Sequence, residues 1–543
     1  MPEYDAEKQP ATAESFPDLT DPQVDAVDSS QLSRRLSPRQ VQMIAIGGTI
    51  GTGLYLGTGR ALATGGPASM LLAYAICGAI VLVTMLSLGE MVAFIPVTGS
   101  FCTFAGRSRF VDESLGFALT WNYWANDAIS TASDLVALQV LLQYWTDNFP
   151  GWALSLICLA FVLGLNLCSV RIFGEAEYWL CLLKIVTIIG FILVGIVVNC
   201  GVNTQHRYLG DRYFYLDDAP FVGGIGGFAS VFVTASFAYG GTENVAVTAG
   251  ETRNPAQTYP RVIRNVFWRV LLFYIVSITI IGLDVPYNYT GLASEGTSTS
   301  PFTIVFAEAG SAVAGSFINA VIMTSAISAA NHALFAGSRL LYTLAKEGYA
   351  PRRFGLTNRF QIPWVAVLTT TTISALCFGA SKIGSGQLWT WLQNLVGVSN
   401  QISWTCICIS SLRFRAAIRR QNLEHLLPFK NFLYPVGPAL AAGLNIFLIL
   451  VQGWSCFSPE FDIIRFVSYY IEIPIMAAMF LGWKFWKGTK LVPLNEMDLV
   501  TDRYLIEGEG IAANSQDVNK PPKSAWPTIL GVGRLKRVGT WIL

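Results

Sequence analysis

Charged residues are scarce in this sequence. Asp, Glu, Lys and Arg together make up 13% of its 543 residues, against 52% for the hydrophobic types, whereas an ordinary globular chain carries about 25% charged residues. A soluble protein of this length needs more polar surface than that to face water. The scarcity of charge therefore excludes an ordinary soluble protein and indicates a chain covered largely by membrane lipid. The net charge of +1 gives no basis for nucleic-acid binding.

Several other signals are missing. The ten cysteines show neither a zinc-ligand spacing nor a secreted disulfide pattern, and buried small hydrophobic residues are the better interpretation. The acidic N-terminus, residues 1–38, lacks the basic and apolar regions of a cleaved signal peptide, so a disordered cytosolic tail is predicted. No nucleophile stands beside a base in a recognisable motif. We therefore expect no enzyme activity, no metal site and no cofactor.

Long apolar segments are what the sequence does have. A membrane-spanning helix needs about 20 mostly apolar residues. Windows of that size fall at 40–62, 68–96, 115–146, 152–170, 176–199, 220–249, 262–284, 312–344, 363–381, 388–412, 434–456 and 463–486. The sequence thus predicts an all-α integral membrane protein with about twelve transmembrane helices over 39–487, followed by a cytosolic C-terminal tail over 488–543.

Basic residues gather in alternate connections between these segments. They lie before the first segment and after the second, fourth, sixth, eighth, tenth and twelfth, while the other connections contain little Lys or Arg. The positive-inside rule then places both termini in the cytoplasm. The sequon at Asn288 falls outside the cell in this orientation, where a glycan can be attached.

Glycine interrupts two of the apolar segments. The first interruption is GGTIGTG at 47–53 and the second is SFAYGGTE at 236–243. Unwound backbone at membrane depth persists only where it is buried in protein or lines a cavity. The two breaks occupy the first helix of each five-helix half, which predicts inverted repeats with a binding site between them near the membrane midplane. Glycines that merely allow close helix packing are the alternative.

Broken helices have a definite binding chemistry. The N–H groups that open the second half-helix have no partner within it, and the helix dipole adds positive charge there, so this end suits a carboxylate. Free carbonyls at the other break suit an ammonium group. An α-amino acid carries both groups and would satisfy both breaks.

Five stretches of the sequence carry a family resemblance. They are GGTIGTGLYLGTG (47–59), GEMVAFIPVTGSF (89–101), FAYGGTENVAVTAGETRNP (237–255), ANHALFAGSRLLYTLAKEGYAPRRF (330–354) and EMDLVTDR (496–503). The chain resembles the fungal amino acid permeases, the yeast amino acid transporter group of the amino acid–polyamine–organocation superfamily, over roughly residues 37 to 503. The resemblance implies a LeuT-like fold of ten core helices in inverted repeats plus two accessory helices. It also implies proton-coupled amino acid uptake at the plasma membrane by alternating access.

The resemblance also implies roles for individual residues. The substrate carboxylate would lie at the first break, formed by Thr49, Ile50, Gly51, Thr52 and Gly53. The amine would meet carbonyls of the second break, around Phe237, Ala238 and Gly240, with the rings of Phe237 and Tyr239 as the inner wall. Lys184 of the fifth segment and Glu243 of the sixth are the candidates for proton coupling. A static structural pair is the alternative for these two buried charges.

The third segment departs from the family pattern. Asp127 and Asp134 are seven residues apart, which places them about 20° apart on one helix face, with Ser130 and Thr131 between them. The family commonly has Glu at the second position and an apolar or aromatic residue at the first. Asp127 is thus an added acid, and one hypothesis is that it recognises a cationic side chain such as that of lysine, ornithine or a polyamine. Pairing with another helix or with cavity water is the alternative.

Transport competes with one other function class. An amino acid receptor of the same fold would bind the substrate and signal without carrying it. The short N-terminal tail and the presence of Lys184 and Glu243 favour a transporter whose partners are an amino acid, protons and membrane lipid. A channel is disfavoured because no selectivity filter or ring of charge is present. For His332 in the eighth segment, packing or a helix–helix hydrogen bond is favoured over a role at a coupling-ion site.

Overall fold

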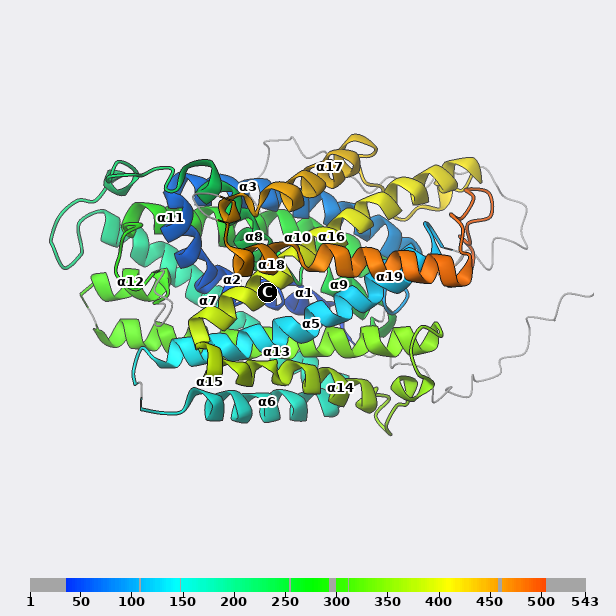
Figure 1. The fold of residues 1–543 in the computed structure, drawn as a ribbon, viewed down its shortest axis with the longest axis horizontal. Helices are drawn as coiled ribbons and strands as arrows, with labels where there is room; N and C mark the ends of the chain where they lie inside the picture. Colours follow the sequence, from blue (N-terminus) through cyan, green and yellow to red (C-terminus); the bar gives the residue numbers. More distant parts are fainter. Residues whose placement is uncertain are drawn as a thin grey trace, which may run out of the picture. The chain divides into compact units, whose positions relative to one another are not determined.

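The structure is a computed structural model that describes residues 36–106, 109–146, 148–252, 255–292, 299–310, 312–457 and 461–503 (Figure 1). The regular structure of these residues is helical. Among them the only β-type pairing is one isolated parallel bridge between Leu36 and Thr252. The all-α class predicted from the sequence is confirmed.

Eight helices or runs of helix in the described residues are long and apolar enough to cross a membrane, and four further helical units accompany them. Seven are long apolar helices or runs of helix: α3 (Gly57–Phe94), α7 (Val170–Asn199), α10 with α11 (Pro255–Arg269 and Ser277–Asp284), α13 (Ala312–Lys346), α14 with α15 (Trp364–Ser374 and Ala380–Ile383), α16 (Ser385–Arg420) and α17 (Val436–Val451). An eighth is the pair α18 (Ile463–Tyr470) and α19 (Glu472–Lys487), bent by 43°. The remaining four are α5 (Glu113–Leu142), the short apolar α6 (Gly151–Leu167) and two broken spans.

The broken spans are the first and the sixth, as the glycines predicted. In the first, α1 (Pro38–Gly47) ends before an irregular stretch, and α2 (Thr52–Tyr55) then runs through Leu56, which keeps helical backbone angles, into the start of α3. In the sixth, α8 (Gly224–Tyr239) and α9 (Asn244–Val247) flank the second irregular stretch. A kink at Gly66, where φ is +82°, separates the end of the first span from the second span within α3.

Shorter helices fill the connections. They are α4 (Phe101–Ala105), α12 (Pro301–Glu308), a π-helical stretch (Val270–Val276) between α10 and α11, and 3-10 turns at Arg212–Phe214, Thr248–Glu251, Arg352–Gly355, Ala375–Gly379, Glu424–Leu426 and Trp454–Cys456.

Helix α5 is central to the packing around the site. It packs most extensively against α13 and α16, while α3 packs against α8 and α1 against α7; Figure 1 shows α5 and α13 side by side. Outer helices expose large apolar side chains instead of polar ones: Trp179 is 65% exposed, Leu440 62% and Phe485 82%. Such surfaces are stable only against lipid, which fits the low charge content of the sequence.

Residues after α19 continue along the bundle. Gly488 ends the helix in a left-handed conformation, and residues 489–503 then pack against the ends of α5 and α16, where Met497 and Leu499 are buried. The sequence placed the start of a cytosolic tail at 488. The structure shows that the first part of that segment is attached to the membrane domain. Below, "basic end" means this end of the bundle, which carries Arg109, Arg339 and Arg415.

Candidate functional site

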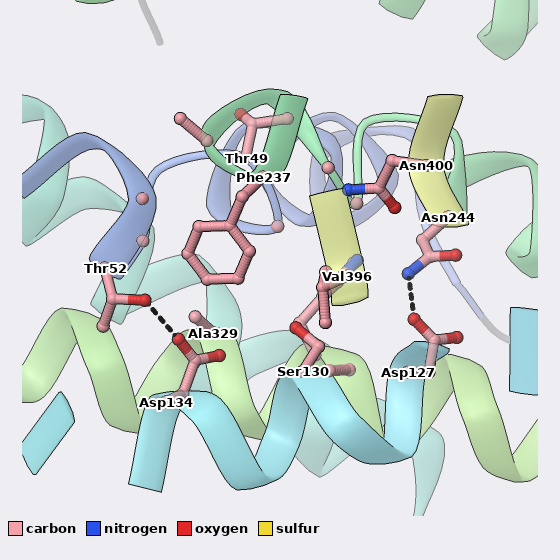
Figure 2. A pocket seen from close by; sticks show the side chains of 18 of the residues that line it. Thr49, Thr52, Asp127, Ser130, Asp134, Phe237, Asn244, Ala329, Val396 and Asn400 are labelled. Atoms are coloured by element: carbon pink, nitrogen blue, oxygen red, sulfur yellow. Dashed lines mark hydrogen bonds between the residues drawn. The ribbon is translucent and has the colours of Figure 1, made fainter. Parts of the chain in front are cut away.

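A small cavity of about 40 Å³ lies between the two helix breaks (Figure 2). The first break, the second break, α5, α13 and α16 all contribute to its wall. Its lining residues are Gly48, Thr49, Gly51, Thr52, Gly53, Asn126, Asp127, Ser130, Asp134, Phe237, Ala238, Gly240, Gly241, Asn244, Ala329, His332, Ala333, Val396 and Asn400. The position between the breaks is the one that the glycine pattern predicted.

The two breaks are in direct contact, and glycine makes the contact possible. A Cβ atom on Gly53 would lie 2.4 Å from the Cα atom of Ala238, which no real side chain could occupy. Gly241 has a φ of +81°, and a Cβ there would lie 2.8 Å from the carbonyl oxygen of Gly48. These glycines therefore allow two stretches of unwound backbone to meet at the cavity.

Backbone N–H groups face the cavity from the first break. Thr49 and Ile50 both direct their N–H groups to the carbonyl of Ile46, at 3.3 Å, so they still belong to the end of α1. Thr52 and Gly53 open the second half-helix, and their N–H groups have no partner within it. A helix start of this kind, with its dipole, has the chemistry that suits an anion, and the binding of a substrate carboxylate there stays a prediction.

The second break offers fewer free carbonyls than the sequence suggested. The Phe237 carbonyl accepts the Gly240 N–H at 3.1 Å. The hydroxyl of Tyr274 lies 2.7 Å from both the Ala238 carbonyl and the Thr49 carbonyl. Tyr274 thus bridges the two breaks, a role that its position in the seventh span did not reveal. The Gly240 carbonyl and the second lone pairs of Phe237 and Ala238 remain for an ammonium group.

Two carboxylates lie on the α5 side of the cavity (Figure 2). Asp134 accepts a hydrogen bond from the Thr52 hydroxyl at 2.6 Å, and Asp127 accepts one from Asn244 Nδ2 at 2.9 Å. Both side chains are buried, and the second oxygen of Asp127, Oδ2, has no hydrogen-bond partner among the described residues. Ser130 lies between them, so the polar face of the third span does line the site.

Three residues proposed from the sequence lie outside the lining. Ile50 is buried in the core, where its N–H bonds the Ile46 carbonyl and its carbonyl accepts a hydrogen bond from Ser325 at 3.2 Å. Thr131 donates to the Asp127 carbonyl of its own helix at 2.9 Å. Tyr239 stacks on Tyr274 with ring centres 4.2 Å apart. Of the two rings expected as an inner wall, Phe237 alone reaches the cavity.

The two candidates for proton coupling are buried behind the lining. Lys184 Nζ donates to the carbonyl of Gly47, the last residue of α1, at 2.8 Å. Glu243 accepts a hydrogen bond from the Tyr123 hydroxyl at 2.6 Å. The carboxylates whose charges act on Lys184 are those of Glu177 and Asp134. The structure therefore places Lys184 and Glu243 in separate polar clusters.

Sequence reasoning missed several polar residues of the site. Asn126 donates to Asn400 at 3.1 Å, and Asn400 donates to the Ser236 carbonyl at 3.2 Å, so a chain of amides joins α5, α16 and α8. His332, for which the sequence favoured packing or a helix–helix hydrogen bond, also lines the cavity, with its ring against Gly48, where a Cβ would lie 2.5 Å from Nε2. The asparagine that follows Glu243, at 244, was the one available signal, because it continues the second break.

Comparisons with known proteins show the family of this chain. Residues 40–495 match the family model described as amino acid permease. A probable amino-acid permease of Schizosaccharomyces pombe is 46% identical over 88% of this chain and 97% of its own length. The lysine-specific permease of Escherichia coli is 41% identical over 86% of this chain and 96% of its own length. The basic amino-acid permease of Saccharomyces cerevisiae is 37% identical over 88% of this chain and 85% of its own length.

These matches confirm the family resemblance and the fold class predicted from the sequence. The family model covers the bundle from α1 to beyond α19, and both breaks lie inside the matched range. This protein therefore belongs to the amino acid permease family, a family of membrane transporters with the LeuT-like fold of about twelve spans, and not of enzymes.

Proposed function

We propose that this protein imports cationic amino acids, of the lysine and arginine class, across the plasma membrane in symport with protons. The observation that carries the proposal is the charge of the cavity. Its lining contains two carboxylates, Asp127 and Asp134, and neither lysine nor arginine. A substrate that is only a zwitterion does not explain an excess of acidic side chains in the lining. A substrate with a second positive charge does explain it.

Asp127 is the carboxylate that we expect to meet the side-chain cation. Its Oδ1 atom is held by Asn244, while Oδ2 is buried without a hydrogen-bond partner in the described part of the chain. A cationic donor would supply the hydrogen bond that this buried oxygen lacks, and the bond would stabilise the bound substrate. The names of three relatives specify lysine or basic amino acids, in Escherichia coli and twice in Saccharomyces cerevisiae, which supports the same substrate class.

Proton coupling is supported by Lys184. Lys184 is 1% exposed, and its ammonium group donates to the carbonyl that closes α1, so loss of its proton would weaken a charge-assisted hydrogen bond at the helix break. A buried group of this kind can load and release a proton as the site alternates between the two faces of the membrane. With the basic end in the cytoplasm, both termini would be cytoplasmic.

The test is uptake of radiolabelled lysine, arginine and leucine in transport-deficient yeast, with and without a protonophore. We expect protonophore-sensitive accumulation of lysine and arginine. Asp127→Asn should lower lysine uptake relative to leucine by on the order of 10-fold or more, because a hydrogen bond to a charged group contributes about 1.5–3 kcal/mol.

Asp284→Asn is the matched control. Asp284 is also buried, also accepts one hydrogen bond from an asparagine, Asn199 at 3.0 Å, and also has an unpartnered Oδ2, but it lies outside the cavity. It should leave the preference for lysine over leucine unchanged. An unchanged preference in Asp127→Asn would reject the cationic substrate, and binding without accumulation of any amino acid would indicate a receptor.

A further inference from the structure

Helix α7 carries a buried carboxylate that the proposed function has not used. Glu177 has no exposed surface. Its Oε1 atom accepts a hydrogen bond from Asn331 at 2.6 Å, and its Oε2 atom accepts one from Ser328 at 2.8 Å. Asn331 is held in turn by Asn166 at 2.9 Å. Both oxygens of Glu177 are therefore fixed by α13, the helix that also contributes Ala329 and His332 to the cavity.

Glu177 and Lys184 flank the same backbone residue. They are seven residues apart on α7, which puts them on one face of the helix. Lys184 donates to the Gly47 carbonyl at 2.8 Å, and a Cβ on Gly47 would lie 3.3 Å from Glu177 Oε2. The last residue of α1 thus sits between an ammonium group and a carboxylate, at the point where the first span unwinds.

Other titratable groups also surround Lys184, and their positions differ from that of Glu177. They are Asp134 on α5, Cys181 on α7, His332 on α13 and, beyond Cys181, Arg269 on α10. Glu177 approaches the same Gly47 that Lys184 bonds, and its opposite charge acts on Lys184. Asp134 lines the cavity, where a substrate changes its surroundings, whereas Glu177 is absent from the lining. Glu177 is thus the carboxylate near Lys184 that does not line the cavity.

We infer that Glu177 is the fixed counter-charge of Lys184, a positioning residue that holds the protonated ammonium at the helix break. The inference rests on the proposed proton coupling. A buried ion needs an opposite charge to remain ionised, and removing one partner leaves the other uncompensated. Release of the Lys184 proton would leave the negative charge of Glu177 without a neutralising positive charge. Glu177 thereby favours reprotonation of Lys184 from water. Because residues of α13 bond both oxygens of Glu177, this protonation step is coupled to the position of α13.

The experiment uses the purified full chain in liposomes and measures lysine uptake driven by a pH gradient across a range of external pH. In Glu177→Gln, protonated Lys184 loses its counter-charge, so driven uptake should require external pH lower by at least about one unit. Lysine counterflow at acid pH should remain. The matched control is Glu175→Gln, the same change two residues away, at a carboxylate that is 40% exposed and bonds Arg39 at 2.8 Å.

A second pair of variants separates this role from simple packing. If Glu177→Gln is unstable because Lys184 is left uncompensated, then Glu177→Gln combined with Lys184→Met should melt at a higher temperature than Glu177→Gln alone. Absence of that recovery would overturn the inference. So would a Glu177→Gln pH profile identical to the wild-type profile while wild-type uptake remains proton-driven. Wild-type uptake that ignores the proton gradient would instead reject the coupling and the inference together.

Discussion

The hydroxyl of Thr52 donates a 2.6 Å hydrogen bond to the carboxylate of Asp134. Thr52 opens the second half of the broken first span, and Asp134 lies on α5. Both are buried. This bond joins the start of the second half-helix to the acidic wall of the cavity, so it fixes these two parts of the cavity lining relative to each other.

Thr52→Val should weaken substrate binding. The valine keeps the shape of the side chain but leaves a buried carboxylate oxygen without its donor, at a cost of about 1.5–3 kcal/mol for a hydrogen bond to a charged group. We expect the Kd for lysine, the proposed substrate, to rise by on the order of 10-fold or more. Equilibrium binding of radiolabelled lysine to purified protein measures this change.

Thr58→Val is the control for that experiment. Thr58 is equally buried, but its hydroxyl bonds the Leu54 carbonyl of its own helix at 2.7 Å and does not line the cavity. Its replacement should change the Kd by less than about twofold, since that carbonyl keeps its place in the helix. Equal Kd values for the two valine variants would show that the Thr52–Asp134 bond plays no part in binding.

The spans and the breaks could be predicted because their signals are local. Lipid imposes a minimum length on each apolar run, and glycine marks unwound backbone at membrane depth. The seven-residue spacing of Asp127 and Asp134 likewise sets their common helix face without any tertiary information. Both acids line the cavity.

Contacts between distant spans could not be predicted in the same way. Tyr274 bridges Thr49 and Ala238, and Asn400 completes an amide chain from α5 to α8, yet nothing in the flanking residues of either distinguishes it from an ordinary buried polar residue. Glu177 was overlooked for the same reason, because its partners lie on α13. The attachment of residues 489–503 was hidden because only a few buried apolar residues, such as Met497, hold an otherwise polar segment.

A buried ion pair at the basic end should contribute strongly to stability. Arg339 Nε lies 3.0 Å from Glu251 Oε1, and the two side chains are 1% and 0% exposed. Arg339→Met leaves an uncompensated buried carboxylate, which costs about 3–5 kcal/mol. Thermal unfolding in detergent should show a large loss for this variant and partial recovery when Glu251→Gln is added.

The matched control for this pair is Arg419→Met. Arg419 pairs with Glu424 at 2.9 Å, with side chains 56% and 46% exposed, so water already screens both charges. The free energy of unfolding should change by no more than about 0.5 kcal/mol. If Arg339→Met were equally mild, the buried pair would not be the contact that holds the end of the sixth span to α13.

The segment 489–503 should stabilise the membrane domain to which it is attached. Arg109 bonds Asp502 at 2.7 Å, and Gln421 donates to the Leu494 and Met497 carbonyls, both at 3.1 Å. A chain ending at Gly488 loses these contacts and exposes the surface that Met497 covers. It should melt at a lower temperature than a chain ending at Arg503, because the latter keeps every contact named here. Identical melting temperatures would mean that the segment is attached without contributing to stability.

Asp112 lies outside the spans, as the N-cap of α5. Its Oδ1 atom accepts hydrogen bonds from the Ser114 N–H at 2.9 Å and the Thr489 hydroxyl at 2.7 Å, and its Oδ2 atom accepts one from Lys484 at 2.6 Å. Burial disfavours the charged carboxylate, but the hydrogen bonds, that of Lys484 foremost, outweigh burial and lower its pKa from 3.8 to about 2. The ionised form therefore stabilises the fold.

The sign of this effect gives a pH dependence. A carboxyl whose pKa is lower in the folded state contributes stability above its unfolded pKa and loses it as the pH falls through the folded value. Asp112→Asn should thus lower the free energy of unfolding by about 2 kcal/mol at neutral pH. The gap between this free energy and that of the wild type should close between about pH 4 and about pH 2. Thermal unfolding in detergent as a function of pH measures the gap. Asp462→Asn, at the N-cap of α18 where the side chain is 40% exposed, should cost less. A gap for Asp112→Asn that persists undiminished at the acid limit would show that its carboxylate is not the stabilising group.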